Sequence, residues 1–278
     1  MTDDSKTEHR MSGSATARNR RLPASVAVLA AAALVPLAGQ GGRGAPAPAA
    51  QAPAPTAQAS APIDLTGYFV SIVSEDWRWR MVTPPKGEYS SVPITEEAKK
   101  LADAWDPDRD AANGEQCKAY GAAGLMRQPT RLHITWQDET TLKVETDAGM
   151  QTRLLHFGDW KAPGGPPTWQ GESKAEWEIP GGRGRGRGDG GGPRFGNLKV
   201  VTTSMRPGYL RKNGVPYGNK ATLSEYWDTV PTQSGDLWLV VTTYVDDPDY
   251  LRQRWITSLN FLKEPDGSRW NPQPCSAT

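Results

Sequence analysis

Residues 131–157 read RLHITWQDETTLKVETDAGMQTRLLHF and contain three runs of strand length that are rich in Thr, Val, Ile and aromatic residues. Polar breakers at 137–140 and 147–150 separate the three runs. Strand-length runs divided by short polar segments are typical of antiparallel hairpins. The stretch therefore predicts a three-stranded antiparallel meander, and later parts of the chain repeat its pattern.

The register of this meander follows from its second turn. If residues 148–149 form a two-residue turn, Val144 faces Arg153, and directly opposed residues share a face of the sheet. An odd-length loop before that hairpin places Ile134 opposite Val144. One face then carries Arg153 among the apolar side chains Ile134, Trp136, Leu142, Val144 and Leu155. A one-residue slip would move this whole set to the other face.

Composition indicates one globular domain with tails. The chain has 278 residues, of which 23% are charged, so it is long enough to bury a core. Its net charge of +1 gives no bulk field that would attract nucleic acid, and a small molecule is the expected partner. The 11 Trp against 4 Phe are unusual. Indoles stack on sugars and planar rings, but they also fill β-sheet cores.

The first 62 residues are predicted to lie outside the folded domain. Arginines precede the apolar run 22–38, which is short and rich in Ala for a membrane span, with an uncleaved anchor as the alternative. This pattern predicts an export signal over 1–39, by either the general or the twin-arginine route. Residues 40–62 are a Pro/Ala-rich linker, so the domain covers 63–278. We therefore expect a periplasmic or secreted protein that is not associated with the membrane once the signal is removed.

Cys117 and Cys275 are the only two cysteines in the sequence. In an exported protein, a lone pair that spans most of the domain indicates a disulfide holding the C-terminal tail. Two free thiols are the alternative.

The segment 95–105 predicts a short amphipathic helix, because Thr95 is a good N-cap and acids fill the first turn. The following Asp106, Asp108 and Asp110 imitate the start of a calcium-binding loop. Position six of that loop is Ala instead of Gly, and position twelve is Cys instead of Glu, which favours a capped polar loop without metal.

The remaining strand patterns extend the sheet. Residues 77–81 alternate Trp with Arg, which predicts a strand with a solvated basic face or, alternatively, an anion-binding stripe. Further strands are expected at 68–73, 174–179, 197–205, 221–228, 237–245 and 255–262. The Gly/Arg-rich tract 181–196 is interpreted as a flexible loop. Recurring hairpins with one short helix predict an all-β, lipocalin-like antiparallel barrel, with a β-sandwich as the alternative.

Three stretches carry a resemblance to other proteins: GEQCKAYGAAGLMRQPTRLHITWQDE, PTWQGESKAEW and RPGYLRKNGVPY. They resemble an uncharacterised family of secreted, tryptophan-rich bacterial proteins. The resemblance covers the chain from about Ile63 onward. It implies export and a β-rich domain but no activity, and the Gly/Arg-rich tract departs from the family's pattern.

The sequence does not carry the motifs of several enzyme classes. It contains no GxSxG, HExxH, P-loop or CxxC pattern. The register places His133 and His156 on the polar face of the meander, so neither a metal site nor a cofactor is expected. The first hypothesis is therefore a binding protein for a small aromatic or sugar ring inside the barrel. Its expected ligand-binding residues are Arg153, Trp136, Trp177, Trp227, Arg211 and Lys212.

The alternative is a metal-free lyase, isomerase or glycoside hydrolase in the same cavity. Alternation over 221–228 places Glu225 on the apolar side with Arg153, where it would act as a general acid or base. Tyr217 and Tyr226 would assist it from the rim. The same two charges also fit a structural ion pair, which the sequence leaves open.

Overall fold

The computed structural model describes residues 54–179 and 196–278. The predicted export signal, most of the predicted linker and residues 180–195, which include all but the last residue of the Gly/Arg-rich tract, lie outside the described residues. Among the helices that are described, none is long and apolar enough to cross a membrane.

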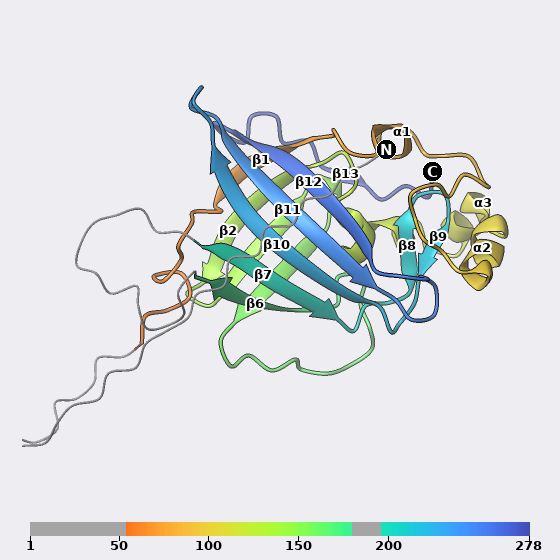
Figure 1. The fold of residues 1–278 in the computed structure, drawn as a ribbon, viewed down its shortest axis with the longest axis horizontal. Coiled ribbons are helices and arrows are strands. Elements are labelled where there is room, and N and C mark those ends of the chain that lie inside the picture. Colours follow the sequence, from red (N-terminus) through yellow and green to blue (C-terminus); the bar gives the residue numbers. More distant parts are fainter. Residues whose placement is uncertain (1–53, 180–195) are drawn as a thin grey trace, which may run out of the picture. The chain divides into compact units, whose positions relative to one another are not determined.

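Nine strands form a closed barrel (Figure 1), which confirms the all-β barrel and excludes the sandwich. Their order around the barrel is β1 (Gly67–Ile72), β12 (Trp255–Glu264), β11 (Leu237–Asp246), β10 (Thr222–Pro231), β7 (Asn197–Thr203), β6 (Glu172–Glu178), β5 (Thr152–Phe157), β3 (Thr141–Thr146) and β2 (Arg131–Asp138). Strand β1 pairs with both β12 and β2 and so closes the barrel.

The predicted register of the meander is confirmed. Val144 lies opposite both Ile134 of β2 and Arg153 of β5, and the side chains of all three are buried. Because the side-chain period of a strand is two, this single register sets which residues of the three strands face the core. Arg153 therefore points inward, as the sequence predicts.

One strand pair departs from the predicted antiparallel pattern. Strands β5 and β6 pair in parallel over only three positions, from Leu155 opposite Ser173 to Phe157 opposite Ala175. Parallel neighbours need a connection that returns to the starting end of the first strand. The Pro/Gly-containing segment 158–171 makes this return, and we call the short β5–β6 junction the parallel seam.

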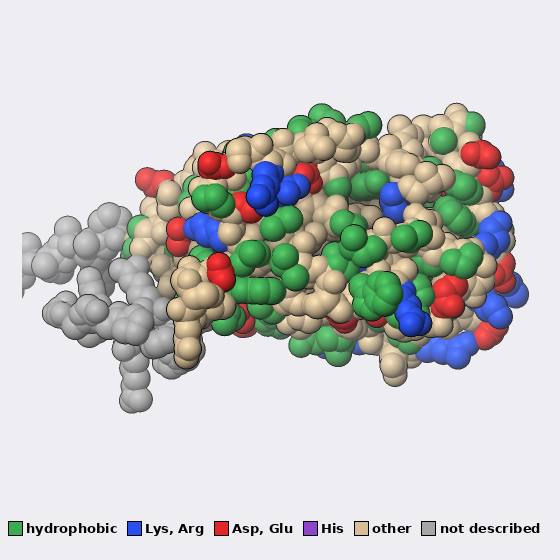
Figure 2. All heavy atoms as spheres, turned by 90° about the horizontal axis from the view of Figure 1, so that it is seen from above, with side chains coloured by type: hydrophobic (Ala, Val, Ile, Leu, Met, Phe, Trp, Pro, Cys, Tyr) green, Lys and Arg blue, Asp and Glu red, His purple; other side chains and the backbone are tan. Residues whose placement is uncertain are grey.

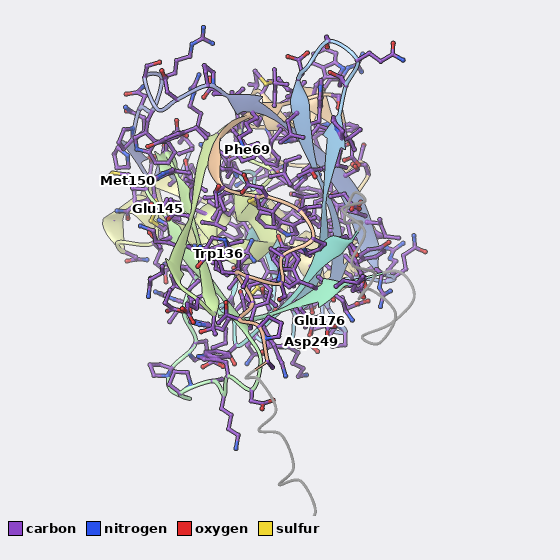
Figure 3. All side chains as sticks on the ribbon, turned by 90° about the vertical axis from the view of Figure 1, so that its left-hand side faces the viewer. Phe69, Trp136, Glu145, Met150, Glu176 and Asp249 are labelled. Carbon is purple, nitrogen blue, oxygen red and sulfur yellow. A yellow bond between two sulfur atoms is a disulfide. The ribbon has the colours of Figure 1, made fainter. Side chains whose placement is uncertain are left out.

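The barrel interior is filled by the protein's own side chains. A continuous apolar cluster draws on all nine strands, and most of its members are fully buried. Figure 3 looks toward the barrel from the left-hand side of Figure 1 and shows side chains throughout, with Phe69 and Trp136 among them. A fully buried side chain leaves no room beside it for a water molecule, so this core is packed as protein interiors usually are.

A second layer caps one end of the barrel (Figure 1). It has its own buried cluster, which includes Ala98, Leu210 and Tyr217. Its elements are α1 (Trp77–Arg80), α2 (Glu96–Asp103), α3 (Pro107–Ala112), a 3₁₀ helix (Lys118–Tyr120), α4 (Ala122–Leu125), β8 (Gly208–Arg211) and β9 (Val215–Tyr217). The predicted helix at 95–105 is confirmed as α2, and Thr95 accepts the N-cap hydrogen bond from the Ala98 amide.

The predicted disulfide is confirmed between Cys117, next to the 3₁₀ helix, and Cys275 in the C-terminal tail. Beside it, β13 (Gln273–Pro274) pairs in parallel with β4 (Ala148–Gly149). The tail is thus fixed to the molecule by one covalent bond and one short ladder.

Two local predictions are wrong. Residues 77–81 are not a strand, because the backbone turns at Asp76, in the left-handed region at φ 54°, and Trp77–Arg80 then wind one helical turn. The fold also begins before residue 63, because the Ala57 carbonyl accepts a hydrogen bond from the Trp177 indole.

Candidate anion-binding site

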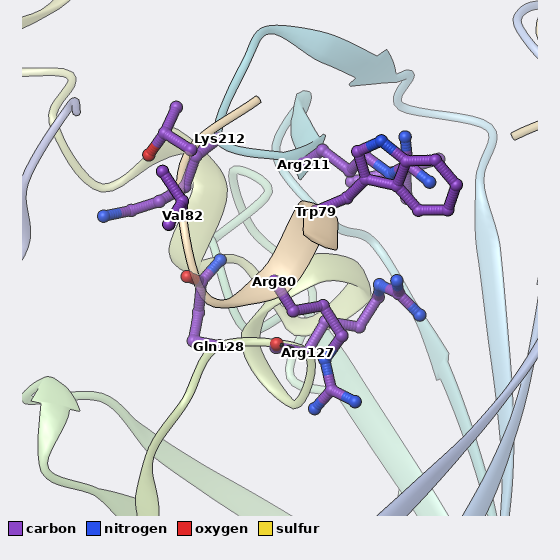
Figure 4. A pocket seen from close by; sticks show the side chains of 9 residues that line it. Trp79, Arg80, Val82, Arg127, Gln128, Arg211 and Lys212 are labelled. Carbon is purple, nitrogen blue, oxygen red and sulfur yellow. Dashed lines mark hydrogen bonds between the residues drawn. The ribbon is translucent and has the colours of Figure 1, made fainter. Parts of the chain in front are cut away.

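Three arginines from separate segments line one small cavity at the cap (Figure 4). Arg80 is the last residue of α1, Arg127 follows α4, and Arg211 ends β8. Trp79, Val82, Gln128 and Lys212 contribute to the lining. The cavity encloses about 20 Å³. A buried water needs about 10–15 Å³ on this measure, so the cavity has room for one or two small atoms.

All three guanidinium-bearing residues are buried, with exposed fractions of 7% for Arg80, 5% for Arg127 and 3% for Arg211. Arginine is seldom buried unless a carboxylate or another acceptor compensates its charge. With three such residues around one cavity, the question is which groups compensate their positive charges.

Protein groups hold each guanidinium in place without satisfying it. Arg80 Nε donates to the Arg127 carbonyl at 2.9 Å, and Arg127 Nη2 donates to Asp76 Oδ2 at 2.8 Å. Arg211 Nη2 donates to Ser91 Oγ at 2.5 Å, and its guanidinium lies 4.9 Å from the centre of the Trp79 ring. These contacts fix the orientation of each of the three side chains.

Four buried nitrogens of this cluster have no hydrogen-bond partner within the described part of the protein. They are Arg80 Nη2, Arg127 Nη1, and Nε and Nη1 of Arg211. A buried donor without an acceptor costs about 1–3 kcal/mol, and more when it is charged. Because buried polar groups are nearly always paired, these donors are the part of the cluster that a water molecule or a ligand oxygen would satisfy.

The charges of the cluster are also unbalanced. Within residues 54–179 and 196–278, Asp76 is the only carboxylate in ion-pair contact with the three guanidiniums, at 2.8 Å from Arg127 and 3.8 Å from Arg211. Burial and the neighbouring Arg127 charge lower the pKa of Arg80 to about 10, and the same two causes lower the pKa of Arg211 to about 10. Mutual repulsion therefore raises the free energy of the cluster, and a bound anion would relieve it.

The predicted ligand-binding residues fall into two groups. Arg211 and Lys212 line the cavity. Arg153 instead forms a two-pronged ion pair with Glu225, with Nη1–Oε1 at 2.9 Å and Nη2–Oε2 at 2.5 Å, and both side chains have no exposed surface. The ion pair is thus the structural one that the sequence left open.

The three predicted ligand-binding tryptophans lie in the barrel core or pack against it. Trp227 is fully buried in the core, the Trp177 indole donates to the Ala57 carbonyl, and Trp136 packs against Phe157 and Trp177. The predicted ring-binding hollow inside the barrel is therefore wrong, because aromatic and aliphatic side chains occupy that volume.

The three predicted catalytic residues do not converge on one site. Glu225 faces the core, whereas the adjacent Tyr226 faces outward and makes an edge-on contact with Tyr244. Tyr217 is buried in the cap, where burial raises its pKa. Neighbouring residues of a strand point to opposite faces, so Glu225 and Tyr226 are separated by the sheet itself.

Sequence reasoning missed Arg80 and Arg127 as site residues. The alternation of Trp and Arg over 77–81 was a signal for Arg80, since it allowed an anion-binding stripe. Nothing local distinguishes Arg127 from a surface arginine, because its partner Asp76 lies 51 positions earlier in the chain.

The predicted calcium-like acids serve the cap instead. Asp106 accepts the N-cap hydrogen bond of α3 from the Arg109 amide, and Asp110 accepts hydrogen bonds from Lys118 and Tyr209. Of the residues that the structure describes, no three His, Cys, Asp or Glu side chains are grouped to hold a metal ion.

Comparison of the chain with protein-family models, with curated proteins and with solved structures finds no match in any of the three.

Proposed function

We propose that the protein is an exported binding protein that takes the anionic group of a small ligand into the arginine cavity. The observation that carries this proposal is that three buried arginines line one cavity and together hold four guanidinium nitrogens without a hydrogen-bond partner in the described residues. Charge-assisted hydrogen bonds to an oxyanion are about twice as strong as neutral ones, so an anion would satisfy these donors well.

The donors of the cluster favour a tetrahedral oxyanion. Within the described residues Asp76 is the one carboxylate in ion-pair contact with the three guanidiniums, while Glu75 and Glu88 act on them from farther away. Guanidinium donors from three separate segments suit the oxygens of a phosphate ester or a sulfate better than the plane of a single carboxylate. The ligand class we propose is therefore a phosphate or sulfate group.

Binding is a better reading of this cavity than catalysis. Its lining contains no Asp, Glu, His or Cys. Arg80 and Arg211, with pKa values of about 10, remain protonated at neutral pH and are poor proton donors or acceptors there. Export is proposed from the N-terminal pattern, and the Cys117–Cys275 disulfide supports an oxidising compartment.

The test is the thermal unfolding of the full chain in increasing inorganic phosphate, compared with chloride at equal ionic strength. Phosphate should raise the melting temperature with a saturable dependence, since a ligand that binds only the folded state stabilises it. Arg211→Gln should weaken phosphate binding by about 10- to 100-fold, the equivalent of losing one or two charged hydrogen bonds.

Arg252→Gln is the matched control, because it removes the same charge from a side chain that is 61% exposed and paired with Glu96. It should leave the phosphate response unchanged. A wild-type protein that responds identically to phosphate and chloride would contradict the proposal without need of any variant.

A further inference from the structure

Three large apolar side chains project into solvent next to the arginine cavity. Trp77 is 58% exposed, Met81 is 57% exposed and Val82 is 71% exposed. They belong to α1 and the two residues that follow it, and we call them the apolar projection. Water-exposed apolar side chains that are grouped in this way mark an interaction surface more often than scattered ones do.

The projection and the cavity are parts of one surface. Val82 lines the cavity itself, beside Arg80 and Arg127. Met81 lines a neighbouring hollow of about 420 Å³ together with Val70 and Ile72 of β1. The apolar surface therefore borders the rim of the cavity and continues along the first strand of the barrel.

Cationic side chains accompany the projection. The Arg78 guanidinium lies 5.5 Å from the centre of the Trp77 ring, and Lys212 lines the cavity next to Val82 (Figure 4). Figure 2 views the molecule from the side on which α1 lies in Figure 1, and shows hydrophobic side chains spread over the middle of this face. Indoles and basic side chains next to exposed aliphatic groups are typical of surfaces that lie at a membrane interface.

The size of the cavity limits what can enter it. About 20 Å³ admits the leading oxygens of one tetrahedral anion, but no ring or chain. The rest of any ligand must lie outside, where the apolar projection begins. A ligand that fits both parts has a compact phosphate group attached to an apolar body.

From this juxtaposition we propose that the protein docks on a membrane surface, with the phosphate of an anionic lipid head group in the arginine cavity and the apolar projection inserted between the lipids. The inference rests on the proposed phosphate-type site and adds the source of the phosphate. It replaces the sequence-based expectation of no membrane association. Two weak signals, one electrostatic and one hydrophobic, are together sufficient for stable peripheral attachment.

The experiment is co-sedimentation of the full chain with vesicles of phosphatidylcholine, with or without phosphatidylglycerol. Wild type should bind the anionic vesicles at least about tenfold more strongly than the neutral ones. Glycerol phosphate, a soluble phosphate monoester without an apolar body, is measured in parallel by thermal shift as a probe of the anion site alone.

Two sets of variants separate the contributions. The combined change Trp77→Ser with Met81→Ser should remove vesicle binding but keep the glycerol phosphate response, because these two side chains are exposed and do not line the arginine cavity. The variant Arg211→Gln should lose both vesicle binding and the glycerol phosphate response. The matched control Val230→Ser with Ile256→Ser, at side chains 48% and 55% exposed, should lose neither.

The outcomes distinguish the two proposals. If wild type responds to glycerol phosphate but does not bind vesicles, the lipid inference is overturned and the anion site stands. If it responds to neither, the proposed function fails as well. Vesicle binding that Arg211→Gln and Arg252→Gln reduce equally would show general charge attraction and would also overturn the inference.

Discussion

Two ways of burying a guanidinium occur in this protein. Arg153 faces one carboxylate, Glu225, and Thr202 Oγ1 accepts a further hydrogen bond from it at 3.2 Å. The arginine cavity instead gathers three guanidiniums around a single carboxylate. The first arrangement is balanced in charge and leaves one buried nitrogen, Arg153 Nε, without a partner in the described residues, whereas the second leaves four such nitrogens and an excess of positive charge. This contrast, rather than burial alone, separates the structural arginine from the candidate binding residues.

The Arg153–Glu225 pair makes a specific prediction for stability. Glu225→Gln removes the negative charge and leaves Arg153 buried without a counterion, which should lower the free energy of unfolding by about 3–5 kcal/mol. The double change Arg153→Met with Glu225→Leu should recover most of this loss, since an apolar pair has no charge to bury. Urea-induced unfolding measures both.

The double-mutant cycle decides between coupling and independent effects. If Arg153→Met and Glu225→Leu lower the stability additively, the two side chains do not interact as the structure indicates. A strongly non-additive result is expected, because each single variant leaves the other charge unpaired.

At the scale of single elements, the sequence predicted those features that depend on local periodicity. The period of two in 131–157 identified the meander, its register and the inward side of Arg153, since one buried face fixes all three together. The cap of α2 was equally local, because Thr95 binds an amide only three residues away.

The features that sequence reasoning missed depend on contacts between distant segments. The helix α1 has the alternation of a strand, but the buried hydrogen bond from Arg80 to the Arg127 carbonyl holds it in another conformation. Similarly, nothing in the loop 158–171 states that β6 will return parallel to β5. For the site, Arg211 and Lys212 were predicted because cationic side chains are close together in the segment that contains them. Arg127, in contrast, becomes part of the cavity only through folding.

The parallel seam should be the weakest ladder of the barrel. Its three register pairs compare with ten between β10 and β11, and parallel pairing is slightly less stable per residue. We expect the amides of β5 and β6 that face the seam to exchange with deuterium at least about tenfold faster than those between β10 and β11. Hydrogen exchange followed by NMR gives the rates, and equal protection of the two ladders would contradict this.

At the scale of the whole molecule, the disulfide connects the cap to the C-terminal tail across 158 positions. A bond that closes so long a loop restricts the unfolded chain strongly. Cys275→Ser should therefore lower the free energy of unfolding by up to about 5 kcal/mol on the chain-entropy estimate. Denaturant unfolding of this variant and of the chemically reduced wild type should agree. A change below about 1 kcal/mol would show that β13 and the tail contacts hold the C-terminus alone.

The position of β1 between β2 and β12 has a consequence for how the protein is made. Tyr68 of β1 lies opposite both His133 and Glu264, so the first strand completes its pairing only with the last barrel strand. A growing polypeptide therefore carries two open strand edges until almost all of it has been synthesised. Pairings between such distant segments form slowly, and exposed edges invite association between neighbouring chains. Protection of the nascent molecule by a chaperone, up to the moment of ring closure, is the requirement that this topology creates.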